Sequence, residues 1–243
     1  MRQPVRTPSS GPAPTRTVVH LLRHGKVHNP GAILYGRLPG YRLARSGEAM
    51  AELVAAHLGD RDITYLAASS LLRAQQTAGP LAARRNLDIH TDDRVIEAGN
   101  RFEGMTVAVG DGVFRDPRHW IKLVNPFRPS WGEPYLEIAH RMLGAIYTAV
   151  QAAAGHEAVL VSHQLPIWTA RRYLEGRRLW HNPSRRECAV ASVTSLTFDD
   201  GVFSALRYEE PAAAIEAVDD PASTESAQRE SAQRESTQPE AGA

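Results

Sequence analysis

The sequence has little cysteine, little lysine and no long apolar run. Cys188 is the single cysteine, which excludes an intramolecular disulfide and any metal site built from several thiolates. Lys26 and Lys122 are the only lysines, so arginine carries nearly all of the positive charge. Arginine suits bidentate binding of oxyanions, although a codon bias of the genome gives the same composition. No apolar run is long enough to cross a bilayer, so no membrane-spanning helix is expected.

The balance of charge narrows the class of protein further. The formal net charge is +1 over 243 residues, so no overall field draws the chain towards nucleic acid or an anionic membrane. The N-terminal segment contains arginines, but the apolar core of a secretory signal does not follow them. We therefore expect a soluble cytoplasmic protein that has no nucleic-acid or membrane partner. The sequence leaves homodimer formation open.

Both ends of the chain have the composition of disordered tails. Residues 1–16 are rich in proline, serine, threonine and arginine, and residues 212–243 are of low complexity, with the pentad ESAQR repeated at 225 and 230. Such segments cannot bury enough apolar area to offset the entropy that ordering costs. We expect two disordered tails, 1–16 and 212–243, around one folded domain over residues 17–211.

Strand and helix patterns alternate between the tails. Apolar runs and apolar periodicity predict, in chain order, a strand at 18–22, a helix capped by Ser46, a strand at 63–67, a helix at about 71–85, a short strand near Ile89, a long helix starting at Pro134, a strand at 158–161, a helix at about 166–175 and two strands at 188–198 and 202–208. The last two strands flank Asp200-Gly201, a good hairpin turn. This order predicts an α/β fold, a three-layer α/β/α sandwich with a mostly parallel central sheet.

Two details of this prediction concern single segments. In the helix that Ser46 caps, the residues expected on the buried face are Met50, Leu53, Val54 and Leu58. Residues 98–131 are poorly periodic, rich in aromatics and too long for a plain connection in a compact domain. A stretch of this length is expected to be a functional lid or to contain short elements of its own.

Two of the predicted buried strands end in a histidine. The run "VVHLLRHG" ends at His24, and the run "AVLVSHQ" ends at His163. Ligands of open α/β sheets bind beyond the carboxyl ends of the strands, so neighbouring strands would bring both imidazoles to one crevice. Arg23 stands beside His24, and Arg73 begins the helix after the second strand. Alone, each residue is more often structural; together they describe a pocket for a tetrahedral dianion such as a phosphate monoester.

The motifs around these residues resemble those of the histidine phosphatase superfamily, also called phosphoglycerate mutase-like. The family's Arg-His-Gly, with an asparagine five residues after the histidine, matches "LLRHGKVHN" with Asn29 in that place. Its second motif matches "SLLRAQQTA" through Arg73, and its Ser-His pair matches Ser162-His163. A glutamate before a Glu-Gly loop matches Glu97 in "VIEAGNRFEG", and "WGEPYLEIAHRM" is similar to the start of the family's Gly-Glu-Ser helix. The resemblance covers residues 17 to 209 in the family's order.

The resemblance implies a role for each clustered residue. His24 would be a neutral nucleophile that forms a phosphohistidine, with its other N–H held by a backbone carbonyl. His163 would be protonated and donate to the phosphoryl oxygens, so the pKa values of the two imidazoles should lie apart. Arg23 and Arg73 would neutralise the charge on the transferred group. Glu97 would be the general acid that protonates the leaving alkoxide and later activates water.

Three further residues are expected to bind substrate. Asn29 would add a neutral donor, and the backbone N–H of Gln164 would add another. Arg101, with the arginines and aromatics of residues 98–131, suggests a flat or apolar leaving group with extra negative charge, although a packed cap has the same composition. The motifs imply no metal and no cofactor, because the phosphohistidine route needs neither.

The same pocket supports hydrolysis or phosphoryl exchange. A phosphoglycerate mutase grips the substrate carboxylate with an Arg-His-Tyr-Gly sequence and a later arginine pair. Here the first place reads "EAGNRFEG", and residues 105–131 contain no adjacent arginines. We therefore expect a phosphomonoester hydrolase acting on a small phosphorylated metabolite. The alternatives are a mutase-type transferase and a non-catalytic module that binds a phosphorylated ligand.

Overall fold

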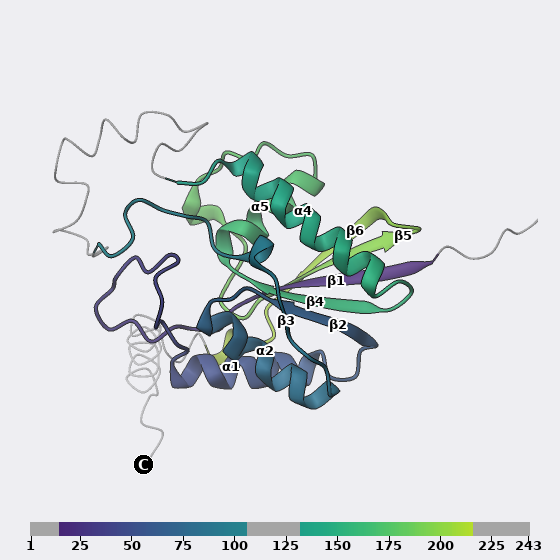
Figure 1. Cartoon of the computed structure of the whole chain (residues 1–243), viewed down its shortest axis with the longest axis horizontal. Helices are drawn as coiled ribbons and strands as arrows, with labels where there is room; N and C mark the ends of the chain where they lie inside the picture. The colour runs from purple at the N-terminus through teal and green to yellow at the C-terminus, as the bar shows by residue number, and fades with distance from the viewer. Residues whose placement is uncertain (1–14, 106–131, 216–243) are drawn as a thin grey trace, which may run out of the picture.

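A six-stranded sheet lies between two pairs of helices in the computed structural model, which describes residues 15–105 and 132–215 (Figure 1). The strands are β1 (Arg16–Arg23), β2 (Ile63–Ala68), β3 (His90–Thr91), β4 (Glu157–Ser162), β5 (Val193–Asp199) and β6 (Val202–Glu209). Their order across the sheet is β3-β2-β4-β1-β5-β6. Strands β3, β2, β4 and β1 run parallel to one another, whereas β5 is antiparallel to both β1 and β6. The predicted mostly parallel sheet is confirmed.

The helices cover both faces of this sheet. They are α1 (Arg45–His57), α2 (Leu72–Arg85), α4 (Tyr135–Ala152) and α5 (Gln164–Leu174), with short 3-10 turns η1 (Asp93–Val95) and η3 (Pro183–Arg185). Helices α1 and α2 pack on one face, and α4 and α5 pack on the other (Figure 1). Neighbouring residues of β1 show the division, since Leu21 belongs to the α4–α5 core and Leu22 to the α1–α2 core. Strands buried on both faces read as continuous apolar runs, which is why this sequence pattern identified them.

The pairing of β1 with β4 sets the position of the two histidines. These strands are parallel, with Arg23 opposite Ser162, so the residues that follow them leave the sheet at the same edge. The backbone N–H of His24 donates to the carbonyl of Ser162 at 3.1 Å, which extends the pairing past the end of β1. His163 is the next residue after β4 and the N-cap of α5. Two segments far apart in the chain therefore end side by side.

The predicted start of the first helix is wrong. Helix α1 begins at Arg45 with Ala44 as its N-cap, and no side chain caps it, so Ser46 lies in the first turn. Leu53 is 42% exposed, although Met50 and Val54 are buried. At 100° per residue Leu53 lies at the edge of the stripe centred on Met50 and Val54, where it meets solvent.

Other boundaries shift by a few residues. Helix α5 begins two residues before Pro166, and β5 begins five residues after Cys188. Asp200 and Gly201 both have positive φ, 50° and 77°, which confirms the predicted turn between β5 and β6. Of the predicted tails, Arg16 belongs to β1, and residues up to 215 are described, with Ala212 buried. The rest of both tails and residues 106–131 lie outside the described residues.

Candidate active site

His24 and His163 lie together at the carboxyl ends of β1 and β4. Both are buried, and their ring centroids are 5.1 Å apart. Nδ1 of His24 lies 2.8 Å from the carbonyl oxygen of Gly25, so this nitrogen carries the proton and donates it. Nε2 is left with its lone pair, and the His24 side chain lines a cavity. The predicted tautomer lock by a backbone carbonyl is therefore present, and the following residue supplies it.

Gly25 is needed here for close approach rather than for an unusual backbone angle. A Cβ on Gly25 would lie 2.5 Å from the carbonyl oxygen of Gly47, a buried residue of α1. The hydroxyl of Thr77 in α2 accepts from the Gly25 N–H at 3.1 Å. The glycine of the Arg-His-Gly motif thus lets the end of β1 press against two helices, which fixes the backbone that carries His24.

His163 is held by a serine and has one unpaired nitrogen. Its Nε2 lies 2.7 Å from the hydroxyl of Ser69, and no group of the described residues hydrogen-bonds to its buried Nδ1. Burial lowers the pKa of His163 and of His24 well below 6.5, and the charges of Arg73 and Arg23 add to this. Burial thus disfavours the charged form of both imidazoles, and the predicted separation of their two pKa values stays a prediction.

The two arginines beside the histidines make no ion pair with a carboxylate within the described chain. Arg73, 1% exposed, donates from Nη2 to the carbonyl of Gly36 at 2.7 Å and lies over the ring of Tyr35, 4.8 Å from its centroid. Arg23 donates from Nη1 to the carbonyl of Cys188 at 2.5 Å. The buried Nε of each arginine has no hydrogen-bond partner among the described residues. Buried donors of a charged group without partners are costly, so the arrangement favours an anion in the pocket.

Glu97 reaches the same cavity from the segment after η1. One of its carboxylate oxygens accepts from the N–H of Ala98 at 2.8 Å. Withdrawal from bulk water raises the pKa of Glu97, although the Ala98 N–H and the charges of nearby arginines oppose this. A carboxyl group with a raised pKa keeps its proton to higher pH, which suits a general acid.

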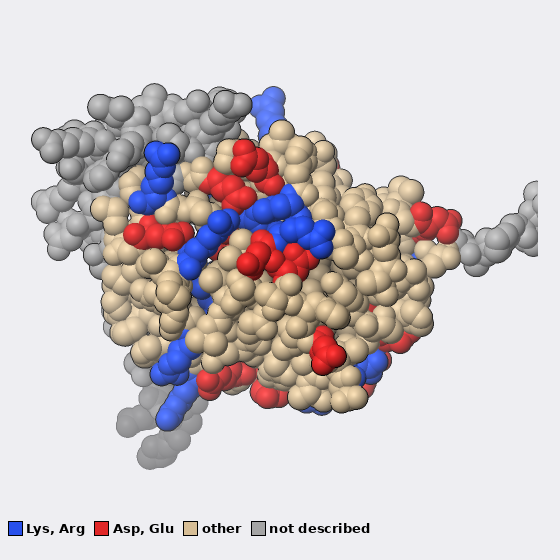
Figure 2. All heavy atoms as spheres, in the orientation of Figure 1, with Lys and Arg blue, Asp and Glu red and all other residues tan. Residues whose placement is uncertain are grey.

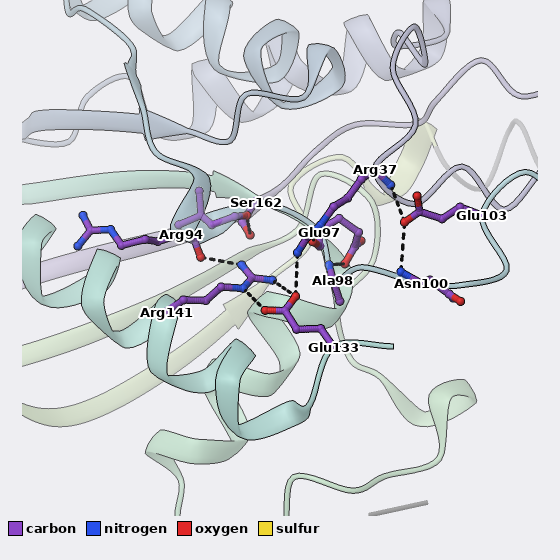
Figure 3. A network of polar contacts seen from close by, with 10 residues as sticks. Arg37, Arg94, Glu97, Ala98, Asn100, Glu103, Glu133, Arg141 and Ser162 are labelled. Atoms are coloured by element: carbon purple, nitrogen blue, oxygen red, sulfur yellow. Dashed lines mark hydrogen bonds and ion pairs between the residues drawn. The ribbon is translucent and has the colours of Figure 1, made fainter. Parts of the chain in front are cut away.

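A network of arginines and one glutamate holds the backbone that carries Glu97 (Figure 3). Arg37 donates from Nε to the carbonyl oxygen of Glu97 at 2.6 Å and from Nη2 to Glu133 at 2.8 Å. Arg141 of α4 forms a bidentate pair with Glu133, with bonds of 2.7 and 3.0 Å, and donates to the carbonyl of Arg94 at 2.7 Å. Glu133 thus ties the loop that carries Glu97 to the start of α4.

The cavity at this site has a volume of about 330 Å³. Its polar wall is made by Arg23, His24, Glu97, Asn100, Glu133, Gln164 and Arg186. Its apolar wall comes from Ile33, Leu34, Tyr35, Tyr135 and Leu165. This volume lies at the small end of ligand pockets and fits a compact metabolite.

Two of the predicted substrate-binding residues lie elsewhere. Asn29 bonds through both side-chain atoms to the backbone of Ile33, at 2.9 and 3.1 Å, and so closes its own loop. Arg101 is exposed and lines a second hollow outside the cavity, together with Arg37 and Glu133. On the face shown in Figure 2, arginine and acidic side chains adjoin one another, so its described part presents no broad patch of one sign. The other cations predicted near Arg101 lie outside the described residues.

The sequence did not single out three residues of the site. Ser69 orients His163, Tyr35 lies under Arg73, and Arg186 adds a cation to the cavity wall. Ser69 directly precedes the quoted run "SLLRAQQTA" and fits the Ser-x-x-x-Arg spacing of the second family motif, which was the available signal. Arg186 gives no such signal, because only the fold distinguishes it from its neighbour Arg185. Cys188 is buried as predicted, and burial raises the pKa of its thiol to about 11.

Residues 15–105 and 132–215 contain no group of three or more histidine, cysteine or acidic side chains placed to hold a metal ion. In the same ranges, the helices are too short or too polar to cross a membrane.

The match to a known family covers the whole folded region. Residues 19–211 match the histidine phosphatase superfamily (branch 1). The chain belongs to this superfamily. Among related sequences, uncharacterized protein Rv0525 of Mycobacterium tuberculosis is 57% identical over 200 residues, which are 82% of this chain and 99% of that protein. Probable phosphoglycerate mutase GpmB of Yersinia enterocolitica is 30% identical over 154 residues, 61% of this chain and 70% of that protein.

Two solved structures share the fold. The mycobacterial glucosyl-3-phosphoglycerate phosphatase Rv2419c has a TM-score of 0.64 at 26% identity, over 81% of this chain and 97% of that one. Bacillus stearothermophilus YhfR has a TM-score of 0.66 at 25% identity, over 77% of this chain and 94% of that one. This histidine phosphatase therefore has a six-stranded α/β sheet of the phosphoglycerate mutase-like type.

Proposed function

We propose that the protein is a phosphomonoester hydrolase that acts through a phosphohistidine at His24 on a small phosphorylated metabolite. The observation that carries this proposal is the pairing of His24 and His163 at 5.1 Å, beside two arginines whose buried Nε groups have no partner among the described residues. Unpaired buried arginine donors also occur away from the cavity, at Arg85 and Arg171, so it is the coincidence of such donors with the two histidines that supports the proposal. Here the unpaired donors surround a nucleophile whose lone pair is fixed in place.

The proposed reaction has two steps. In the first, Nε2 of His24 attacks phosphorus, the ester P–O bond breaks, and Glu97 gives its proton to the leaving alkoxide. In the second, the Glu97 carboxylate takes a proton from water, the water oxygen attacks phosphorus, and the P–N bond breaks. Inorganic phosphate leaves, and His24 and Glu97 return to their starting states.

The cations would act on the transferred group throughout. Arg23 and Arg73 neutralise charge that spreads over the phosphoryl oxygens in the transition state. A bound dianion also favours the charged form of a nearby imidazole. Burial lowers the pKa of His163, so we expect His163 to take up a proton together with the substrate and to become a charged donor.

Hydrolysis is favoured over phosphoglycerate isomerisation by what the sequence lacks. The segment after Glu97 does not contain the family's Arg-His-Tyr-Gly sequence, and residues 105–131 contain no adjacent arginines. Two relatives point in different directions, since one is named a probable phosphoglycerate mutase and the other a glucosyl-3-phosphoglycerate phosphatase.

The experiment is turnover of p-nitrophenyl phosphate in EDTA by wild type, His24→Ala and His28→Ala. His28 lies in the loop after the nucleophile and is exposed, so its replacement is the matched control. We expect wild type and His28→Ala to release phosphate and His24→Ala to lose at least about a thousandfold in kcat. Rapid quenching with labelled substrate should place the label on His24.

Each alternative has its own signature. A wild type that binds phosphate tightly but does not turn over would make the protein a binding module. Isomerisation of phosphoglycerate that a bisphosphorylated primer stimulates would make it a mutase.

A further inference from the structure

A third arginine, Arg186, lines the active-site cavity and has no part in the proposed reaction. It follows η3 and is half-buried in the cavity wall beside Gln164 and Tyr135. Arg23 and Arg73 already flank the nucleophile. Another cation in so small a cavity calls for a separate explanation.

Within the described residues, the side chain of Arg186 bonds only to neutral groups. Its Nε donates to Nε2 of His181 at 2.8 Å, and its Nη1 lies 3.4 Å from the side-chain oxygen of Gln164. The other ring nitrogen of His181 donates to the carbonyl of Leu179 at 2.6 Å, which fixes Nε2 as an acceptor. His181 is buried, and burial lowers its pKa, so it stays neutral.

The carboxylate adjacent to Arg186 in the sequence forms an ion pair with a different arginine. Glu187 follows Arg186 directly, but it pairs at 2.9 Å with Arg171 of α5, which also pairs with Glu175. No ion pair joins Arg186 to a carboxylate within the described residues. Arg186 is thus an oriented guanidinium that forms no ion pair within the described residues, although the charge of Glu97 acts on it.

Arg186 lines the same cavity as Glu97. The charges of Arg23 and Arg73 act on both His24 and Glu97, and the smaller effect of Arg186 is on Glu97. In the proposed reaction the general acid stands where the alcohol part of the substrate departs. A guanidinium that shares the cavity with this acid, and that the two steps do not use, is available to that alcohol part.

We propose that Arg186 binds a second anionic group, a carboxylate or another phosphate, on the alcohol part of the substrate. The preferred substrates are therefore compact phosphomonoesters with two anionic groups. A guanidinium fork binds either group in a bidentate manner. This inference rests on the proposed hydrolase function and narrows its substrate class. Arg186 lies outside the segment after Glu97 and outside residues 105–131, where a phosphoglycerate mutase would carry the residues that bind the substrate carboxylate.

The test compares substrates that differ only in the second anionic group. One pair is 3-phosphoglycerate and glycerol 3-phosphate, in which a hydroxymethyl group replaces the carboxylate. The other pair is fructose 1,6-bisphosphate and fructose 6-phosphate. The measurement is kcat/KM for phosphate release by wild type, Arg186→Met and Arg185→Met. Arg185 is the matched control because it is adjacent, exposed and outside the cavity wall.

We expect wild type to prefer the doubly anionic member of at least one pair by about 10- to 100-fold, the range for a lost charge-assisted hydrogen-bonded pair. Arg186→Met should remove this preference, and Arg185→Met should keep it. A preference in the first pair alone identifies a carboxylate, and one in the second pair alone identifies a phosphate. Equal rates within both pairs for wild type, or equal loss in both variants, would overturn the inference.

Binding separates this inference from the proposed function. Calorimetry on His24→Ala, with and without Arg186→Met, measures affinity for the same compounds without turnover. A preference that depends on Arg186 in this background supports the subsite even if wild type released no phosphate. Absence of release would then count against the hydrolase proposal, and absence of the affinity difference would count against the subsite.

Discussion

At the scale of single residues, the site depends on protonation states that burial sets in opposite directions. Burial lowers the pKa of His24, which must be neutral to attack, and raises the pKa of Glu97, which must be protonated to act first. Both shifts disfavour the charged form, and both place the group in the state that the first step needs. The environment of each group thus supports the proposed roles of Glu97 as acid and His24 as nucleophile.

The pH dependence of kcat/KM should reflect these two groups. Activity should fall as pH drops through the lowered pKa of His24, because protonation removes its lone pair. It should fall as pH rises through the raised pKa of Glu97, because the acid is then lost. In Glu97→Gln the part of the alkaline limb that belongs to Glu97 should disappear, while the acidic limb of His24 and the dependence on proton uptake by His163 stay. Limbs from ionisation of the substrate are common to both proteins.

The same variant should discriminate between leaving groups. Glu97→Gln should lower kcat by about 10²- to 10⁴-fold for alkyl phosphates and far less for p-nitrophenyl phosphate, whose phenolate needs no proton. Glu48→Gln, at an exposed carboxylate in α1, is the control and should match wild type. An equal loss for both substrates would contradict the role of general acid.

At the scale of elements, the network of Arg37, Glu133 and Arg141 joins the loop of Glu97 to α4. Glu133 lies between two guanidinium groups and is 16% exposed, so its charge is shielded from water more than in a surface pair. None of these residues lines up in a simple sequence pattern, because they come from three segments. Their common effect is to fix the carbonyl of Glu97 and hence the direction of its side chain.

Replacement of Glu133 should disturb both stability and catalysis. Glu133→Ala leaves two partly buried guanidinium groups without their acceptor, so the free energy of unfolding should fall by about 1–3 kcal/mol. The alkaline limb of the pH profile should also shift, because the Glu97 carboxyl is no longer held in place. Urea denaturation and kcat/KM against pH measure the two effects. Glu137→Ala, exposed in the first turn of α4, is the control, and a Glu133→Ala profile that overlays it would argue against the positioning role.

At the scale of the whole molecule, the sequence predicted the layers because buried parallel strands are recognisable. The runs ending at His24 and His163 are apolar on both faces, and the family motifs at their ends gave the site its first members. The cap of α1 was missed because Ala44 has no side-chain signal. Arg186 was missed because facing a cavity is a property of the fold. Asn29 bonds through both polar side-chain atoms to the backbone of Ile33, and its predicted contact with the substrate stays a prediction.

A ligand that needs both strand ends should stabilise only the folded chain. We expect inorganic phosphate at 100 times its dissociation constant to add about 2.7 kcal/mol to the free energy of unfolding. Thermal denaturation at constant ionic strength, with acetate as the control anion, measures this as a rise in Tm. Arg73→Met should abolish the rise. An unchanged Tm for wild type would mean that the pocket does not hold the anion.

The proposed chemistry also depends on the register between β1 and β4. The chain positions of His24 and His163 are separated by most of the domain, and only the alignment of Arg23 with Ser162 brings their rings together. A slip of one residue would send alternate side chains to the opposite face and part the two rings. Turnover would therefore require a correctly assembled sheet. Recovery of activity during refolding should follow the pairing of β1 with β4 rather than the formation of any helix.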